Sequence, residues 1–581
     1  MEMHNLKSSD TGSEGVFRRG DEILHTTPSS HASENSRVER RRSLRRNICV
    51  VGIILLLVII YLVAVRSSKK DDGADQASTV LSSFLTTSAS IDSALLKDPD
   101  TPQSKALQWI VKHNPTTTDH WISRGRNEED AQKLLLQRYV LVVFFFSTLG
   151  TVDKNDGSIK YSSWNVTTNW MTDQSVCTWY GVNCLDEFGQ IFDDLDATED
   201  GVIESLQLPS NSIIGILPDE IRLLGELQKL DLRDNALEGT LPSRLSETPK
   251  LKELVLAENQ IGGKVPTQFG QLQVLEMLDL SQNELEGSMP DELGYAFELR
   301  YLNLEMNDFK GKIADLSLLG NLEELNLRFN TFYGTLPDFY NMYKMKLLTL
   351  AHNELTGTIP TQYRAMTLLE TLNLANNELT GAIPGEAFQT MDHLKKVILS
   401  HNRLSGAIPS ELASLGSLEE LDLGDNDLSG SIDDWSPFAG LTILRVHNNH
   451  LSGELPNITM PSMRVLVLSM NNFMGYIPTQ FADMIQLREL ILADIELSGT
   501  IPGEIFQNMV DLRTFNLEGN HIVSGTIPTE LEQLNSLSYL GIEETAVTGT
   551  VSSVICDRKI SGALELTVNC EYIECDCCDC Q

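Results

Sequence analysis

The sequence predicts an α/β solenoid, a right-handed superhelix of about 15 stacked turns with a helical cap before it and a cysteine-rich cap after it. One pattern, L-x-L-x-x-N-x-L-x-G-x-I-P, recurs fifteen times within residues 202–555 with a period of 22 to 25 residues. A chain of 581 residues is too long for one ordinary core but suits such an array. An uncharged apolar run at residues 48–65 adds one predicted N-terminal transmembrane helix.

Each turn of the pattern predicts one short strand. In residues 230–235, LDLRDN, the leucines alternate with polar residues, which is typical of a half-buried strand. Stacking such strands into a parallel sheet buries a face that no turn could bury alone. The asparagine is present in thirteen turns, and Ile495 and Thr545 replace it in the other two. We expect its amide to bond unpaired backbone groups of its own and the adjacent turn, so it is structural rather than a ligand contact.

The apolar run at residues 48–65 has eighteen residues, just enough to span the hydrocarbon core of a bilayer. Six clustered arginines precede it and three basic residues follow it, so the positive-inside rule places the N-terminus in the cytoplasm. A cleaved signal peptide would need a short basic leader, whereas 47 polar residues come first. We expect a single-pass type II signal anchor in the plasma membrane or an endomembrane, with the repeats extracellular or lumenal.

Composition divides the chain into six segments. An apolar run at residues 139–146 is too short to cross a bilayer and is expected to pack on the next domain. The expected segments are a disordered basic cytoplasmic tail (1–47), the anchor (48–65), a Ser/Thr/Asp-rich stalk with one short helix (66–101), a helical N-terminal cap closed by a disulfide (102–201), the repeats (202–555) and a cysteine-rich C-terminal cap (556–581).

Cysteine usage suits an oxidising compartment. Eight cysteines follow the anchor, two near one end of the array and six at the other. The candidates for disulfide bonds are Cys177, Cys184, Cys556, Cys570, Cys575, Cys577, Cys578 and Cys580. The CDCCDC run could instead bind a soft metal as thiolates, although an even count favours disulfides, and their connectivity stays open. Asn165 and Asn457 stand in glycosylation sequons.

The G-x-I-P turns resemble the plant-type leucine-rich-repeat class, found in receptor-like proteins and in algal surface proteins. The stretch WMTDQSVCTWYGVNC at residues 170–184 is similar to the N-terminal cap of that family, which implies a disulfide between Cys177 and Cys184. The helical lead-in and the cysteine-rich tail resemble the algal members, which have an N-terminal signal anchor and no kinase domain. The land-plant receptors differ, because their membrane span and kinase follow the repeats.

Catalytic chemistry finds no support in the sequence. There is no glycine-rich phosphate loop, no H-R-D or D-F-G motif, no G-x-S-x-G and no H-E-x-x-H, so we expect no enzyme activity and no cofactor. A net charge of −37 argues against nucleic acid as a partner.

Function is therefore expected on surfaces, first on the concave face of the array. The candidate ligand contacts are Asn326, Arg328, Thr349, Asn373, Lys396, Ser400, Asp422, Arg445 and His447. Trp435 lies on a loop that breaks the repeat, as a binding anchor or as a plug for a packing gap, the plug being slightly favoured.

These features favour a membrane-anchored recognition module for a protein, peptide or polysaccharide, which acts through a partner kinase or adaptor. The alternative is a structural adhesion protein of the cell surface or wall that does not signal. A saturable protein or peptide ligand would favour the first, and binding of glycans alone the second.

The charge asymmetry around residues 48–65 generates a topological prediction. Protease added to intact cells should remove the repeats and spare the N-terminus, as immunoblots against tags at the two ends can show. Digestion of the N-terminal tag from outside would contradict the type II orientation.

Overall fold

A computed structural model describes residues 70–113, 128–148, 151–152, 159–186, 201–413, 415–432 and 434–578. The chain forms two compact units, Met1–Ser90 and Ile91–Gln581. The described part of the first unit is helix α2 (Lys70–Ser88), which is longer than the short helix expected in the stalk. The predicted anchor at 48–65 and tail at 1–47 lie outside the described residues. None of the helices in the described ranges combines the length and apolarity needed to cross a membrane.

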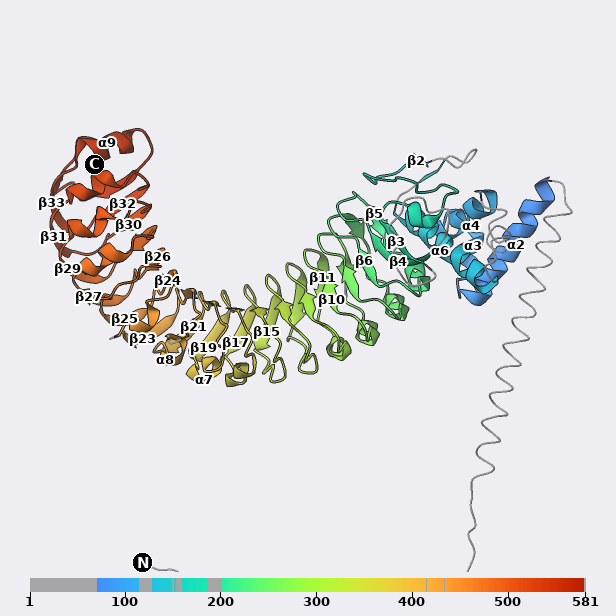
Figure 1. Ribbon diagram of the computed structural model, residues 1–581, viewed down its shortest axis with the longest axis horizontal. Coiled ribbons are helices and arrows are strands. Elements are labelled where there is room, and N and C mark those ends of the chain that lie inside the picture. Colours follow the sequence, from blue (N-terminus) through green and yellow to red (C-terminus); the bar gives the residue numbers. More distant parts are fainter. Residues whose placement is uncertain are drawn as a thin grey trace, which may run out of the picture. The chain divides into compact units, whose positions relative to one another are not determined.

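The second unit is built on a long sheet with one strand per turn, and it confirms the predicted solenoid of parallel strands (Figure 1). Its parallel strands, in spatial order, are β4 (Val202–Gln207), β6 (Lys229–Asp231), β8 (Glu253–Val255), β10 (Met277–Asp279), β12 (Tyr301–Asn303), β14 (Glu324–Asn326), β16 (Leu347–Thr349), β18 (Thr371–Asn373), β20 (Lys396–Ile398), β22 (Glu420–Asp422), β24 (Ile443–Arg445), β26 (Val465–Val467), β28 (Glu489–Ile491), β30 (Thr514–Asn516), β32 (Tyr539–Ile542) and β34 (Glu565–Val568).

Successive strands of this sheet pair so that equivalent positions of the repeat lie side by side. Leu254 pairs with Leu278, and Leu278 with Leu302, so equivalent leucines stack along the core. The array bows so that this sheet lines the inner side, whereas the short helices α7 (Gly385–Phe388) and α8 (Ser410–Ala413) lie on the outer side (Figure 1). The first sheet is therefore the concave face.

A second set of parallel strands follows the asparagine position of each turn and forms one two-stranded and one 14-stranded sheet. Its strands are β5 (Ile214–Ile216), β7 (Ala236–Glu238), β9 (Gly262–Gly263), β11 (Glu284–Gly287), β13 (Asp308–Gly311), β15 (Thr331–Thr335), β17 (Glu354–Gly357), β19 (Glu378–Ala382), β21 (Arg403–Gly406), β23 (Asp427–Ser431), β25 (His450–Glu454), β27 (Asn472–Gly475), β29 (Glu496–Thr500), β31 (Ile522–Thr526), β33 (Ala546–Thr550) and β35 (Ile573–Glu574). Gly381, at φ +80°, shows why the pattern requires glycine, because a Cβ there would lie 2.9 Å from Cγ2 of Thr358.

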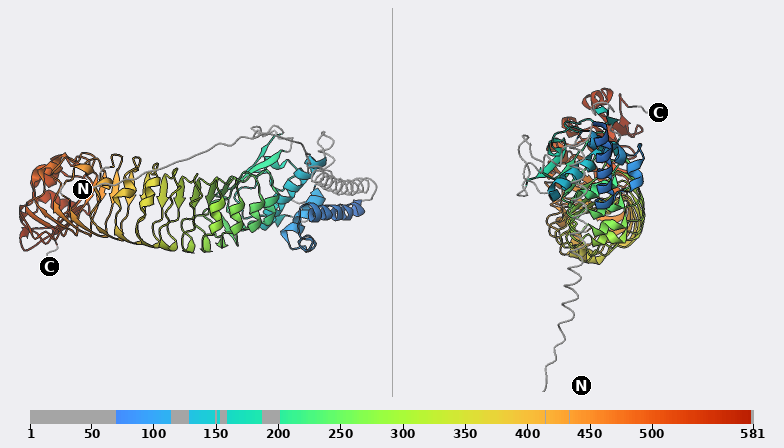
Figure 2. Two further views of the ribbon diagram at one scale, coloured as in Figure 1. Left: turned by 90° about the horizontal axis from the view of Figure 1, so that it is seen from below. Right: turned by 90° about the vertical axis from the view of Figure 1, so that its right-hand side faces the viewer.

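Short helical segments, mostly 3₁₀, close most turns on the outer side, and the view from below shows the turns side by side (Figure 2). Besides α7 and α8, they are η2 (Asp219–Leu223), η3 (Ser243–Glu247), η4 (Thr267–Gln271), η5 (Asp291–Tyr295), η6 (Thr361–Ala365), η7 (Ser436–Phe438), η8 (Thr479–Asp483), η9 (Gly503–Gln507) and η10 (Thr529–Gln533). Most follow the proline of the repeat, which pre-sets the backbone at the helix start.

The conserved asparagine position joins successive turns as expected. Asn377 is 9% exposed, and its Oδ1 accepts the amide of Leu355 in the preceding turn at 3.0 Å. Its Nδ2 donates to the carbonyls of Leu350 (3.0 Å), Leu374 (3.1 Å) and Ala375 (3.2 Å). One amide thus satisfies backbone groups of two turns that strand pairing leaves unpaired.

The N-terminal cap seals the first turn. Its elements are α4 (Pro102–His113), α6 (Glu128–Ser147), β1 (Thr151–Val152), β2 (Ile159–Tyr161), η1 (Val176–Thr178) and β3 (Val182–Leu185), which pairs antiparallel to β4. Helix α3 (Ser93–Lys97) lies in the segment predicted as a stalk but belongs to the same unit as the cap. The apolar run of α6 is buried, and Phe145 packs on Trp164 with ring centroids 5.2 Å apart. Helix α6 also contacts η2 and β4 of the first turn, so it packs on the next domain as expected. Cys177 and Cys184 form the predicted disulfide.

The C-terminal cap contains a sixteenth strand that the sequence analysis missed. Helix α9 (Ser553–Ile560) replaces the outer segment, and β34 then pairs with β32. Disulfides join Cys556 to Cys577 and Cys575 to Cys578. Of the two alternatives for this run, the structure therefore shows disulfide bonds and not thiolates that bind a metal. Cys570 is also disulfide-bonded, and Cys580 lies outside the described residues.

The asparagine contacts generate a stability prediction. Replacing Asn377 by Leu should lower the free energy of unfolding, because each buried backbone group left unpaired costs about 1–3 kcal/mol. Asn535→Leu is the matched control, since this asparagine is exposed on the outer side. Chemical denaturation should show a loss for Asn377→Leu alone, and equal stability of the two variants would contradict the role of the ladder.

Glu220 generates a prediction of pH dependence. Its side chain is buried at the cap, Oε1 accepts from Nε2 of Gln103 at 3.0 Å, and Oε2 has no partner. Desolvation is the main cause that raises the pKa of this carboxyl. A raised folded-state pKa means that stability is fully present below the unfolded pKa and is lost as pH rises through the folded pKa.

Replacing Glu220 by Gln should therefore raise the melting temperature at pH 7 and give no gain at a pH below the unfolded pKa. Glu292→Gln is the control, because Glu292 occupies the equivalent position of η5 and is exposed. A gain that does not change with pH would show that ionisation of Glu220 is not its cause.

Candidate functional site

The concave face presents the predicted contacts unequally. Thr349 and Ser400 are only 7% and 6% exposed, so they offer little surface to a ligand. Lys396 is exposed, and the remaining candidates are half-buried, namely Asn326, Arg328, Asn373, Asp422, Arg445 and His447.

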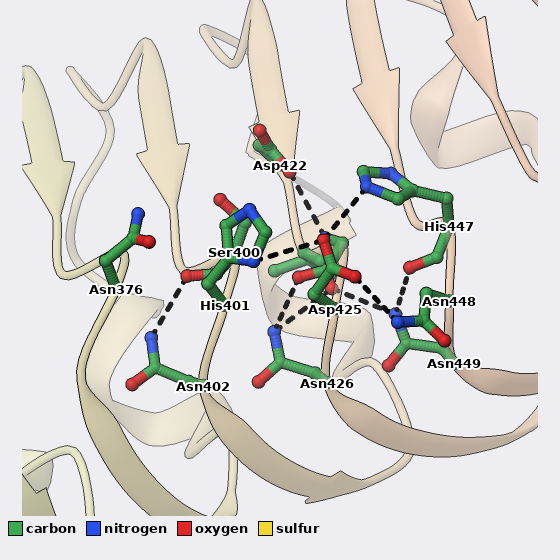
Figure 3. Close-up of polar contacts among 12 residues, drawn as sticks. Asn376, Ser400, His401, Asn402, Asp422, Asp425, Asn426, His447, Asn448 and Asn449 are labelled. Atoms are coloured by element: carbon green, nitrogen blue, oxygen red, sulfur yellow. Dashed lines mark hydrogen bonds and ion pairs between the residues drawn. The ribbon is translucent and has the colours of Figure 1, made fainter.

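The clearest polar cluster of the face is centred on Asp425, which the sequence analysis did not select (Figure 3). Its Oδ2 lies 3.3 Å from Nδ1 of His401 and 3.1 Å from Nε2 of His447. Its Oδ1 accepts from Nδ2 of Asn448 at 2.6 Å. Three successive turns therefore converge on one carboxylate, and we call His401, Asp425, His447 and Asn448 the central cluster.

Backbone geometry explains how these side chains meet. The residue just before the conserved asparagine adopts a left-handed conformation in nearly every turn, for example at His401 (φ 54°), Asp425 (φ 55°) and Asn448 (φ 50°). The same backbone in each turn directs these side chains along one line at the end of the strands. The sequence shows that one residue always precedes the asparagine of the repeat, but it does not show that the backbone of this residue is left-handed.

The same row of residues continues toward the N-terminal turns, where its side chains make aromatic contacts. The guanidinium of Arg328 lies 4.5 Å from the ring centroid of Phe329, and Phe329 stacks on His352 with centroids 4.1 Å apart. Burial, followed by the charges of Arg328 and His401, lowers the pKa of His352. Nδ2 of Asn376 lies 3.5 Å from Nε2 of His352. Cationic, aromatic and polar groups thus form one strip beside the central cluster.

Acidic neighbours pair with the three cations among the predicted ligand contacts. Arg328 contacts Glu305 at 3.2 Å, whereas Lys396 and Arg445 share Glu420 at 3.1 and 3.6 Å. A ligand anion must therefore compete with a carboxylate already present at each position. Asn326 also donates to Glu305, at 2.6 Å. Asp422 and Asn373 each accept a backbone amide two residues later, at 3.1 Å.

Trp435 packs as a plug. It is 4% exposed, its Nε1 donates to the carbonyl of Glu454 at 3.0 Å, and its ring lies 5.7 Å from that of Phe473. Both sequon asparagines, Asn165 and Asn457, are exposed. Their glycosylation stays a prediction.

Comparison with known proteins agrees with this architecture. Two family models, both described as leucine rich repeat, match residues 249–309 and 367–428, and residues 226–247 and 511–534. Receptor-like protein 41 of Arabidopsis thaliana is 29% identical over 112 residues. That match covers 19% of this chain and only 12% of the relative, so most of the relative's length is unmatched.

Two solved receptor structures are similar over most of the array. A TDR receptor structure has a TM-score of 0.57 and 26% identity, and the match covers 65% of this chain and 69% of that one. The Arabidopsis receptor kinase HAESA was solved in complex with the peptide hormone IDA and the co-receptor SERK1. It has a TM-score of 0.55 and 26% identity, with coverage of 69% and 78%.

The central cluster depends on a small residue beneath it. A Cβ on Gly424 would overlap the ring of His447, because it would lie 2.2 Å from Cε1 and 2.6 Å from Nδ1 of that ring. Gly424→Ala should therefore displace His447 and break its contact with Asp425, with the ladder of strands intact. A crystal structure of the variant checks this expectation, and an unmoved imidazole would contradict it. Gly416→Ala is the control, because a Cβ there meets no neighbouring atom.

Proposed function

Since this chain belongs to the plant-type leucine-rich-repeat family of receptor-like proteins, we propose that it is a non-catalytic recognition module whose concave face binds a peptide or an extended protein segment. The observation that carries the proposal is the row of side chains from Arg328 to Asn448, which offers donors, acceptors and aromatic surface across six successive turns. An extended chain laid along this strip could contact each turn in order.

The similar receptor supports the choice of ligand class. HAESA is described in complex with a peptide hormone and a co-receptor, and its fold matches most of this array. By analogy, we propose that this chain also acts with a membrane partner, such as a kinase or an adaptor. Anchoring through residues 48–65 and an extracellular or lumenal position for the repeats belong to the same proposal, and the disulfides of both caps suit that compartment.

A site-directed crosslinking experiment tests the proposal. A photoreactive phenylalanine analogue at Phe329, which is 37% exposed on the strip, should capture a peptide or protein from a cell-surface extract. The same analogue at Tyr340, 52% exposed on the outer side, is the position control. Capture at both positions or at neither would count against recognition by the concave face.

The captured segment, made synthetically, then allows affinity to be measured. Asp425→Ala should weaken its binding by about tenfold or more, because the loss of a charged hydrogen-bonding partner costs roughly 1.5–3 kcal/mol. A double change on the outer side, Arg364→Ala with Glu386→Ala, should leave affinity unchanged, since both residues are exposed there. Equal losses in the two variants would contradict the proposed site.

A further inference from the structure

The residue that precedes each strand of the concave sheet forms a second continuous row, which we call the flank row. Backbone hydrogen bonds connect its members directly: the amide of Arg488 donates to the carbonyl of Arg464 at 2.8 Å, and that of Arg513 to the carbonyl of Arg488 at 2.7 Å. The flank row lies before the strands, whereas the central cluster lies after them. The two therefore occupy opposite edges of the same face.

Charges alternate along the first part of the flank row. Eight successive turns place there, in order, Lys252, Glu276, Arg300, Glu323, Lys346, Glu370, Lys395 and Glu419. Glu323 pairs with Arg300 at 2.8 Å on one side and with Lys346 at 2.6 Å on the other. Hydrogen bonds from Lys346 and Arg300 lower the pKa of Glu323. Arg300, Lys346 and Lys395 thus each lie between two acidic neighbours, whereas Lys252 has one, because Gln228 precedes it in the row.

The alternation ends at Glu419. The uncharged Thr442 occupies the next turn, and three arginines then follow in three successive turns. Arg464, Arg488 and Arg513 are all exposed. The polar contact of Arg464 is with Gln486, at 3.5 Å. Within the described part of the chain, no ion pair engages any of the three guanidinium groups. Three adjacent like charges therefore face solvent on a protein whose net charge is −37.

We propose that Arg464, Arg488 and Arg513 form a binding site for a linear acidic polysaccharide that carries carboxylate or sulfate groups. A guanidinium is suited to this role, because it binds either group through two parallel hydrogen bonds and stays charged at any physiological pH. Because no ion pair in the described part of the chain engages them, these arginines can bind an anion without first breaking one. Arg328, Lys396 and Arg445 are already paired with carboxylates, so an anion that binds them must first displace an acidic side chain.

Spacing distinguishes this ligand from an acidic peptide. Neighbouring strands lie about 4.8 Å apart, and the three arginines repeat once per strand. An extended peptide presents side chains on one side every ~6.6 Å, which falls out of step with the row. A linear polysaccharide with an acidic group on each sugar instead offers closely spaced anions along its whole length, so several of them can pair with the three guanidinium groups at once. The site goes beyond the proposed function and does not require the central cluster.

The test uses the full-length chain in mild detergent with four immobilised probes. Polygalacturonate and dextran sulfate supply the carboxylate and sulfate forms of the ligand. Neutral dextran controls for the sugar backbone, and poly-L-glutamate represents an acidic peptide. We expect binding to at least one acidic polysaccharide, weakened by added NaCl, and none to neutral dextran. Stronger binding to poly-L-glutamate, or no binding to either acidic polysaccharide, would overturn the proposal.

Arg488→Glu separates the ligand site from a structural role. This change restores the alternating pattern, so it should leave the melting temperature unchanged or higher, yet it should reduce polysaccharide affinity by about tenfold or more. The charge-matched control changes three exposed cations elsewhere, Lys264, Lys310 and Arg364, to Gln. The variant Arg464→Gln with Arg488→Gln and Arg513→Gln alters net charge equally and should lose binding, whereas the control should retain it. Equal losses would show a general charge effect and would overturn the site.

The two proposals fail independently. Loss of polysaccharide binding in Arg488→Glu should leave crosslinking at Phe329 intact, because the strip lies at the other edge of the strands. Asp425→Ala should conversely leave polysaccharide affinity unchanged. A loss of polysaccharide binding in Asp425→Ala that matches the loss in Arg488→Glu would contradict a separate site on the flank row.

Discussion

The interaction on which this structure depends is the buried amide that joins each turn to the next. In a solenoid every loop leaves backbone donors and acceptors that no strand can pair, and burial makes each of them costly. The asparagine side chain satisfies groups of two turns at once, as at Asn377. Because this requirement is met inside, the positions around each strand are free to vary, and both proposed sites consist of such positions.

The two edges of the concave sheet use that freedom differently. After the strands, a left-handed residue in each turn directs side chains along one line, and these side chains contact one another across turns. Before the strands, long charged side chains pair with their neighbours or, at three arginines, face solvent. One scaffold therefore carries an ordered strip of hydrogen-bonding groups beside an open row of charge. The ligands proposed for the two edges differ in the same way.

Much of the fold was predictable, because every turn must bury its leucines, pair its loop backbone through the asparagine and reverse the chain at the glycine. The Cys177–Cys184 bridge was expected from the resemblance of its motif. The sixteenth strand was missed, although Leu566 and Val568 align with the two inward residues of the preceding strand, because Glu571 stands at the asparagine position and no G-x-I-P follows. The ion pair of Lys396 with Glu420 and the convergence on Asp425 depend on which side chains meet across turns. The order of residues in the sequence does not show which side chains contact one another between turns.

The alternating flank row has a consequence for how such an array can change in length. Deleting or duplicating a single turn between Lys252 and Glu419 would place two like charges side by side, whereas a pair of adjacent turns can be gained or lost without changing the order of signs. One turn is the repeating unit of the fold, but only a change of two turns keeps the alternation of charge in this part of the array. Chimeras that remove one turn or two should differ in stability for that reason alone.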